Sequence, residues 1–244
     1  DGKPTISNGV HCASIEHKLG IHGSPTAVMV YGEDEECLGE IVGDEMGGMR
    51  AMFVMMNNAR LMVGCQGVQI AERATQQAQR FAAERVQSSL AGSPDRTPVT
   101  IDQHPDVRRM LMEAKAMTEG LRALCLWGGL QVDLSHKAAS EEERQLADDL
   151  IGLLTPVIKG VGTDAGYRIA TDSQQVYGGH GYIAEWGMDQ FVRDARINMI
   201  YEGTNGIQAL DLLGRKVLMD GGAKFGRFAA LVQAFIEENA GPPE

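Results

Sequence analysis

The chain of 244 residues carries a formal net charge of −11, and 43% of its residues are hydrophobic. Its length suits one large domain, or one domain with part of another, and its apolar content is sufficient for a core. The negative charge disfavours nucleic acid or an anionic membrane surface as a partner, and no run approaches the roughly 20 apolar residues of a membrane span. Aromatic residues are scarce at 5%, whereas Met numbers 13 and Gly 30, which favours closely packed helices.

The cysteines lie far apart in the sequence and form no C-x-x-C pair. This pattern favours reduced thiols in a cytoplasmic protein over a disulfide framework. The residues concerned are Cys12, Cys37, Cys65 and Cys125. The chain opens without Met inside a predicted β segment, and residues 240–244 read as a linker. We therefore expect a piece of a longer protein.

Residues 1–45 are predicted to be the β part of the chain. A strand is expected at residues 26–31, a turn at 32–36 and a second strand at 37–42, which together predict a hairpin. The histidines of this part have spacings that match no established ligand pattern, so we predict no metal site. They are His11, His17 and His22.

The pattern becomes helical at Met49. Met49, Met52, Phe53 and Met56 recur at helical spacing and are predicted to enter the core. A second helix is expected over residues 57–87, where a stripe of small and apolar residues lets another helix approach closely. The stripe consists of Leu61, Gly64, Val68, Ala71, Thr75, Ala78 and Ala82.

A polar loop is expected at residues 88–100, and Pro105 suits the first position of a third helix that ends near His136. Its apolar residues recur at helical spacing and are predicted to face inward. They are Val107, Met110, Leu111, Ala114, Met117, Leu121, Leu124 and Val132.

Ser140 followed by Glu143 forms a capping box that opens a fourth helix. Pro156 is expected to kink or break this helix, and a further helical run reaches Val176. The glycine cluster of residues 178–181 ends that run, because glycine supports positive φ and close approach of a ligand.

Helices are predicted over residues 188–197 and 207–219, and the chain breaks between them at Glu202 and Gly203. Thr204 or Asn205 is suited to cap the second helix. A carboxylate on such a short turn is free to point into a cavity, and Gly203 permits close approach of a ligand. On spacing alone, a solvated acidic turn is the commoner interpretation.

These elements predict a mainly α fold, an up-down helical bundle preceded by a small β remnant. Residues 1–45 would be the end of a β domain and residues 46–220 the helical bundle domain. Residues 221–244, which include an amphipathic helix at 225–238, would begin a C-terminal extension or linker. Bundles build ligand sites from facing helices and the turns at their ends.

The segment Ile-Tyr-Glu-Gly-Thr at residues 200–204 resembles the catalytic signature of the acyl-CoA dehydrogenase family, and Arg-Asp-Ala-Arg at residues 193–196 fits the same pattern. The resemblance implies that Glu202 is the base that removes the α proton of an acyl-CoA thioester, while hydride passes to N5 of FAD. It also implies that the backbone N–H of the base helps to bind the thioester oxygen. Burial beside an acyl chain is expected to raise the pKa of this carboxyl.

Two further stretches resemble segments of the family that contact ligands. Residues 57–60, Asn-Asn-Ala-Arg, imply that Asn57 and Arg60 contact the substrate together with Gly203. From the residues alone, Arg60 could equally be a surface charge near a helix end. Residues 175–181, Gln-Val-Tyr-Gly-Gly-His-Gly, resemble a segment whose glycines let the backbone approach the flavin diphosphate.

The family has Glu-Arg where this chain has Glu84 and Arg85, and that Arg reaches the pyrophosphate of a neighbouring subunit's flavin. Ser88 and Ser89 replace the Phe-Gly of the family. The resemblance therefore does not indicate how the adenine half of FAD is bound. Arg85 also reads as a surface neighbour of Glu84. The FAD-binding residues implied by the resemblance are Arg85, Gln87, His104, Gln175, Gly178, Gly179, Thr204 and Asn205.

Residues 104–109, 154–160 and 206–216 are similar to the long branch of the family that includes 3-methylmercaptopropionyl-CoA dehydrogenases. The resemblance implies an acyl-CoA substrate, an electron-transfer flavoprotein or similar acceptor, and a cytoplasmic homodimer or homotetramer. The N-terminal helical domain of the family and most of its β domain are absent, so this piece alone is expected to be inactive. The competing hypotheses are a non-catalytic dimerisation or flavin-binding module and an acyl-CoA oxidase-like enzyme.

Overall fold

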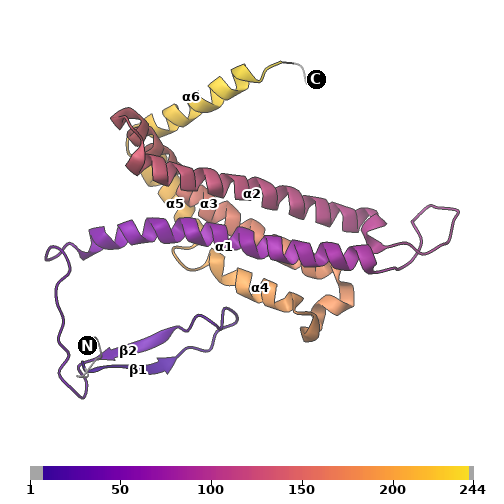
Figure 1. Ribbon diagram of the computed structural model, residues 1–244, viewed down its shortest axis with the longest axis horizontal. Coiled ribbons are helices and arrows are strands. Elements are labelled where there is room, and N and C mark those ends of the chain that lie inside the picture. Colours follow the sequence, from indigo (N-terminus) through magenta and orange to yellow (C-terminus); the bar gives the residue numbers. More distant parts are fainter. Residues whose placement is uncertain (1–7, 242–244) are drawn as a thin grey trace. The chain divides into compact units, whose positions relative to one another are not determined.

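The structure is a computed structural model that describes residues 8–241. It contains two compact units that divide between Met55 and Met56. The first holds a two-stranded sheet and the second is helical, which confirms the predicted mainly α fold (Figure 1). The first residues, where the chain was predicted to open inside a β segment, and most of the linker predicted at 240–244 lie outside the described residues. Among the helices described, none combines the length and apolar character that a membrane span requires.

The sheet pairs β1 (Val10–Ile15) with β2 (Ala27–Tyr31) in antiparallel fashion. β2 confirms the strand predicted at nearly the same residues, but the predicted partner strand at 37–42 is wrong. The side chain of Asn8 holds the backbone of Leu38 instead, accepting from its N–H at 2.8 Å and donating to its carbonyl at 2.9 Å. Sequence reasoning missed β1 because its residues lack a clear alternation of apolar and polar side chains.

The first long helix, α1 (Gly48–Glu84), runs without interruption where two helices were predicted. It ends earlier than the predicted boundary of the 57–87 helix. The prediction that the methionine cluster enters the core is wrong, since Met49 is 63% exposed and Phe53 is 41% exposed. Helical periodicity identified an apolar face correctly but does not reveal whether another segment covers it.

The second long helix, α2 (Pro105–Lys137), begins at the predicted proline, which occupies the first helical position. Met110, Ala114 and Leu121 are buried as predicted. Met117 is 44% exposed, so its predicted inward position is wrong. One face of α2 therefore enters the core along most of its length.

The third long helix, α3 (Glu141–Val176), starts with the predicted capping box. The Ser140 hydroxyl accepts from the Glu143 backbone N–H, and the Glu143 carboxylate accepts from the Ser140 backbone N–H, both at 3.2 Å. Of the kink or break expected at Pro156, the break is wrong, because α3 continues through this residue, and the kink stays a prediction. Pro156 is buried in the bundle, where packing outweighs the loss of one backbone hydrogen bond.

Glycines bring the backbones of α1 and α3 into contact. A Cβ atom added to Gly67 would lie 2.6 Å from the carbonyl oxygen of Gly162. One added to Gly166 would lie 2.6 Å from the carbonyl oxygen of Gly67. Close helix approach was predicted from the small-residue stripe, and every residue of that stripe is buried. These residues are Leu61, Gly64, Val68, Ala71, Thr75, Ala78 and Ala82.

Replacing Gly166 with Ala is expected to lower the free energy of unfolding by about 1–3 kcal/mol, because the methyl group would force the two backbones apart. The matched control is Gly152→Ala on the same helix, where an added Cβ meets no atom within 4 Å. The control should stabilise the protein by about 0.5–1 kcal/mol through helix propensity. Urea denaturation of both variants measures the difference, and equal effects would rule out the backbone contact as the cause.

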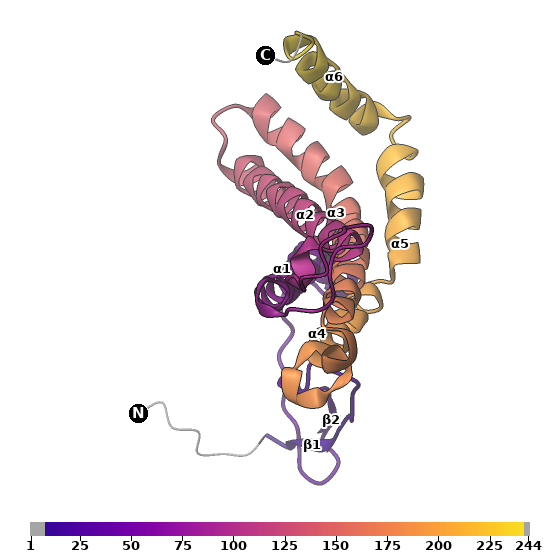
Figure 2. The same ribbon diagram turned by 90° about the vertical axis from the view of Figure 1, so that its right-hand side faces the viewer.

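The elements after α3 are all shorter than the three long helices. The helix α3 lies between α2 and α5 (Figure 2). The helix predicted at residues 207–219 is divided into an α-helical and a π-helical segment, and α6 confirms the helix predicted at 225–238. In chain order the elements are η2 (Gly178–Tyr182), η3 (Ala184–Trp186), α4 (Met188–Arg196), η4 (Ile197–Met199), α5 (Asn205–Leu210), η5 (Asp211–Val217) and α6 (Ala223–Glu238).

The last helix, α6, is attached to α3 by charge. Asp149 on α3 is only 1% exposed, and both Lys224 and Arg227 of α6 pair with its carboxylate. The Nζ atom of Lys224 lies 3.7 Å from a carboxylate oxygen of Asp149. The pairing places α6 beside the beginning of α3.

Candidate functional site

The Glu202 turn joins η4 to α5 and holds two consecutive residues in left-handed conformations, with φ of +55° at Glu202 and +82° at Gly203. For a residue with a side chain, this conformation costs roughly 1–2 kcal/mol. Thr204 caps α5, because its hydroxyl accepts from the Ile207 backbone N–H at 3.4 Å. Of the two predicted caps, Thr204 is the one used. The Glu202 side chain is half-buried.

Two buried side chains hold the backbone carbonyl groups of this turn. Lys159 of α3 is fully buried, and its Nζ atom donates to the Gly203 carbonyl at 2.7 Å. Gln208 of α5 is 1% exposed, and its Nε2 atom donates to the Gly203 carbonyl at 3.1 Å and to the Glu202 carbonyl at 3.3 Å. Within residues 8–241, the backbone N–H of Glu202 makes no hydrogen bond. The turn is therefore fixed through its backbone carbonyl groups, while the Glu202 N–H can still donate a hydrogen bond to a ligand.

Arg60 lies against the same turn. Its residue exposure is 6%, which excludes the interpretation as a surface charge. Its NH1 atom lies 3.2 Å from Oδ2 of Asp211, and its NH2 atom lies 3.6 Å from the Cβ position that a side chain at Gly203 would occupy. Asn57, almost one turn earlier on α1, is exposed. The structure thus brings Arg60 together with the Glu202 turn, and the substrate-binding role of Asn57 stays a prediction.

The side chain of Asn205 is used inside the protein. Its Nδ2 atom donates to Asp164 at 2.7 Å, to the Thr163 hydroxyl at 3.0 Å and to the Gly160 carbonyl at 3.2 Å. Its Oδ1 atom accepts from Lys159 at 2.8 Å. These bonds tie the beginning of α5 to α3. The flavin contact predicted for Asn205 stays a prediction, and its side chain has a second, structural role.

The charges beneath the turn act on one another. Burial lowers the pKa of Lys159 to about 8, and nearby Arg60 lowers it as well, whereas the Asp164 and Glu202 carboxylates raise it. Burial also raises the pKa of the hydroxyl of Tyr201, the residue before Glu202. Glu202 is thus one of several charges that share a small, partly desolvated volume.

A cavity of about 740 Å³ lies where the end of α1, the beginning of α2 and the end of α3 meet. All predicted cofactor residues except Thr204 and Asn205 line it. These residues are Arg85, Gln87, His104, Gln175, Gly178 and Gly179. The residues that line the cavity come before α4 in the chain, and the Glu202 turn comes between α4 and α5 (Figure 1). The structure thus brings together residues that the family resemblance assigned to one cofactor, and their role as cofactor ligands stays a prediction.

Backbone hydrogen bonds shape the cavity. The Ile101 N–H donates to the Arg85 carbonyl at 2.8 Å, and the Gln87 N–H donates to the Val99 carbonyl at 3.0 Å. Nε2 of His104 lies 2.7 Å from the Gln87 carbonyl oxygen. Since a carbonyl oxygen only accepts, the imidazole donates through Nε2. The loop predicted after α1 thus folds back to the helix and fixes both Arg85 and His104.

Sequence reasoning missed the aromatic wall of this cavity. Phe81 stacks on Tyr177 with ring centroids 4.1 Å apart, and His180 meets Trp186 edge-on at 5.1 Å. Phe81, Tyr177 and His180 line the cavity. Phe81 lies far from the other three residues in the sequence, so only its place near the end of α1 and their place around the glycine cluster indicated a shared location.

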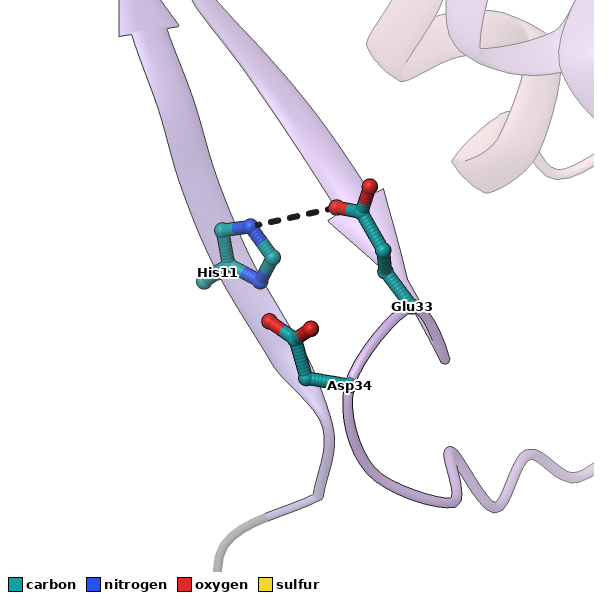
Figure 3. Close-up of side chains that lie close together, drawn as sticks. All are labelled: His11, Glu33 and Asp34. Atoms are coloured by element: carbon teal, nitrogen blue, oxygen red, sulfur yellow. Dashed lines mark ion pairs between the residues drawn. The ribbon is translucent and has the colours of Figure 1, made fainter.

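One group of potential metal ligands gathers on the first unit, as Figure 3 shows. His11 of β1 lies 3.7 Å from Glu33, and Asp34 completes a group whose ligand atoms lie within 4.8 Å of one another. All three side chains are exposed. The histidine spacing did not reveal this group, because its other members are carboxylates from the turn after β2. A solvated ion pair explains it.

Residues 46–218 match the family described as acyl-CoA dehydrogenase, C-terminal domain. The chain belongs to the acyl-CoA dehydrogenase family, as its sequence signature predicted. It is 48% identical over 96% of its length to the 3-methylmercaptopropionyl-CoA dehydrogenase of Ruegeria pomeroyi, of which it covers 39%. It is 36% identical over 99% of its length to a butyryl-CoA dehydrogenase of Syntrophomonas wolfei, of which it covers 40%.

Among solved structures, the chain resembles butyryl-CoA dehydrogenase from Megasphaera elsdenii with a TM-score of 0.66 and 26% sequence identity. That similarity covers 88% of this chain and 49% of the solved chain. The chain thus spans about two fifths of the length of the curated relatives and about half of this solved chain.

Proposed function

We propose that the full-length protein containing this chain is an FAD-dependent acyl-CoA dehydrogenase in which Glu202 removes the α proton of an acyl-CoA thioester. The observation that carries the proposal is the Glu202 turn. It presents a half-buried carboxylate on a strained backbone that buried side chains hold in place. Family membership indicates the class of reaction, which is dehydrogenation of an acyl-CoA, and the Glu202 carboxylate of the turn is the proposed base.

Removal of an α proton places negative charge on the thioester oxygen, and that charge needs hydrogen-bond donors. The carbonyls of Glu202 and Gly203 are held by side chains of the bundle, while the Glu202 N–H makes no hydrogen bond within residues 8–241. This N–H is the donor that we assign to the thioester oxygen. Arg60, Asn57 and Gly203 contact the substrate around it. When bound, FAD accepts the hydride from the β carbon.

The cavity beside α1 fits the nucleotide part of FAD. Arg85 offers a guanidinium for phosphate oxygens, and Gly178 and Gly179 leave backbone accessible because an added Cβ would meet nothing within 4 Å. The aromatic wall suits an adenine ring. We assign the nucleotide part to Arg85, Gln87, His104, Gln175, Gly178 and Gly179 and the flavin part to Thr204 and Asn205. From the family resemblance, and not from this cavity, we further propose a cytoplasmic homodimer or homotetramer that passes electrons to an electron-transfer flavoprotein or similar acceptor.

An anaerobic titration tests the function. The full-length protein is purified with FAD, and acyl-CoA thioesters of different chain length and substituent are added while the visible flavin spectrum is recorded. We expect at least one thioester to bleach the spectrum. If the protein binds FAD but no thioester bleaches it, the dehydrogenase proposal fails. Reoxidation by oxygen instead of an electron-transfer acceptor would identify an oxidase.

Replacing Gly179 with Leu is expected to weaken FAD binding by about 10-fold or more, because the side chain would enter the nucleotide cavity and displace ligand contacts. An added Cβ has free space there and φ is not positive, so the fold should persist. The matched control, Gly226→Leu on α6, also has free space and lies outside the cavity. Flavin content after dialysis measures the effect, and full retention in Gly179→Leu would remove this cavity from the FAD site.

A further inference from the structure

Lys159 is a fully buried lysine in the middle of α3, next to the buried Ile158. A buried ammonium is costly unless it is paired. Among the described residues, however, no carboxylate oxygen lies within 4.0 Å of its Nζ atom, and its acceptors are the neutral Gly203 carbonyl and the Asn205 amide oxygen. A stabilising ion pair therefore does not explain why a lysine occupies this position.

Satisfying a buried carbonyl does not explain it either. The Gly203 carbonyl already accepts a hydrogen bond from Gln208 at 3.1 Å. What Lys159 adds is a link between two points of the chain, because its two acceptors lie on either side of Thr204. One ammonium thus fixes both the end of the Glu202 turn and the first residue of α5.

Fixing these two points restricts the peptide groups that carry the left-handed residues Glu202 and Gly203. Their conformation sets the direction of the Glu202 side chain and of its backbone N–H. A base and an oxyanion donor must be held in place before the reaction if they are to act efficiently. The Glu202 carboxylate also interacts electrostatically with Lys159. Arg60 and Asp164 are the other charged groups that act on Lys159.

We propose that Lys159 is a positioning residue for the base. By donating at once to the Gly203 carbonyl and to the Asn205 side chain, it holds the Glu202 turn in the geometry that proton abstraction requires. This inference rests on the proposed function, since it assumes that Glu202 is the base.

The test uses the full-length protein with bound FAD and a thioester that bleaches the wild-type flavin. In Lys159→Met, the side chain keeps its length but loses its donors. The rate of flavin reduction in a single turnover is expected to fall by about 10- to 100-fold, as for other misplaced catalytic groups. The Kd for the thioester should change by less than about threefold, because Lys159 bonds to Gly203 only at its carbonyl, whereas the proposed side-chain contacts to the substrate, Arg60 and Asn57, lie on α1.

Lys159→Gln, which keeps a neutral donor, should recover part of the lost rate. The matched control is Thr155→Val, which removes a buried hydroxyl one turn earlier on α3, where it bonds only to the Ile151 carbonyl. The control should reduce flavin at the wild-type rate. If it slows the reaction as much as Lys159→Met does, general loosening of α3 is the cause and the positioning role is refuted.

A wild-type rate in Lys159→Met also overturns the proposal. If Lys159→Met does not retain flavin, Lys159→Gln decides: a slowed reduction with an unchanged Kd supports the role, and a wild-type rate refutes it. The wild-type protein separates this inference from the proposed function. If no thioester bleaches the wild-type flavin, the function itself fails, whereas bleaching in the wild type with no effect of Lys159 leaves the function intact.

Discussion

Replacing Glu202 with Gln is expected to slow flavin reduction in the full-length enzyme by about 10²–10⁴-fold, the usual contribution of a positioned general base. The amide has nearly the shape of the carboxylate but does not accept the α proton. The left-handed backbone is unchanged, and within the described chain the Glu202 side chain makes no hydrogen bond that the amide would break. Stopped-flow absorbance of the bound flavin under anaerobic conditions measures the rate.

The matched control for this experiment is Glu185→Gln, which removes an exposed carboxylate from η3. It should leave the rate of flavin reduction unchanged. A Glu202→Gln protein that reduced its flavin at nearly the wild-type rate would show that another group is the base. Retained flavin and an unchanged thermal midpoint would confirm that the substitution affects chemistry and not folding.

Replacing Asp211 with Ala is expected to lower the free energy of unfolding by about 3–5 kcal/mol, because it leaves the charge of Arg60 buried without its partner. The side chains of Arg60 and Asp211 are 7% and 6% exposed, and their closest atoms are 3.2 Å apart. Among the described residues, Asp211 is the only hydrogen-bond acceptor of the Arg60 side chain, and the Nε atom of Arg60 has none. Urea denaturation measures the change.

Two controls test whether the loss of stability comes from leaving a buried charge unpaired. Asp106→Ala breaks the exposed pair with Arg109 and should cost no more than about 1 kcal/mol. The double variant with Arg60→Met and Asp211→Leu removes both buried charges and should be within about 1 kcal/mol of the wild type, or more stable. Since this double variant is expected to fold, weaker acyl-CoA binding by the full-length double variant would report the substrate contact of Arg60. Equal losses for Asp211→Ala and Asp106→Ala would contradict the buried-pair interpretation.

Local signals in the sequence predicted the helical part of the fold well. Pro105 and the Ser140 capping box each depend on a few neighbouring residues, and both helix starts are confirmed. The small-residue stripe of α1 is buried throughout. Arg85 and His104 line one cavity. Only the family resemblance linked these two residues, because it contains information about tertiary contacts that no local pattern provides.

The errors arose where distant segments decide the outcome. The partner of β2 is β1 and not residues 37–42, a choice made by contacts across the chain. Pro156 is kept in a helix by tertiary packing. Lys159 was part of a stretch that resembled the family, yet its burial and its hydrogen bonds to Gly203 and Asn205 were not predicted. The available signal was a single charge inside an apolar helical run, which reveals burial but does not identify the acceptors.

The glycine contact between α1 and α3 has a consequence for how the site is lost on heating. A Cβ added to Gly64 would lie 2.8 Å from the Ile158 carbonyl oxygen, and Arg60 and Lys159 stand within about one helical turn of this contact. The separation of the backbone positions that carry the two cations is therefore set by touching backbones, and the hydrogen bonds to Asp211 and Gly203 then hold the charged ends. The cations should keep their spacing until the helices themselves part, so this section of the site disappears in the same cooperative step as the bundle.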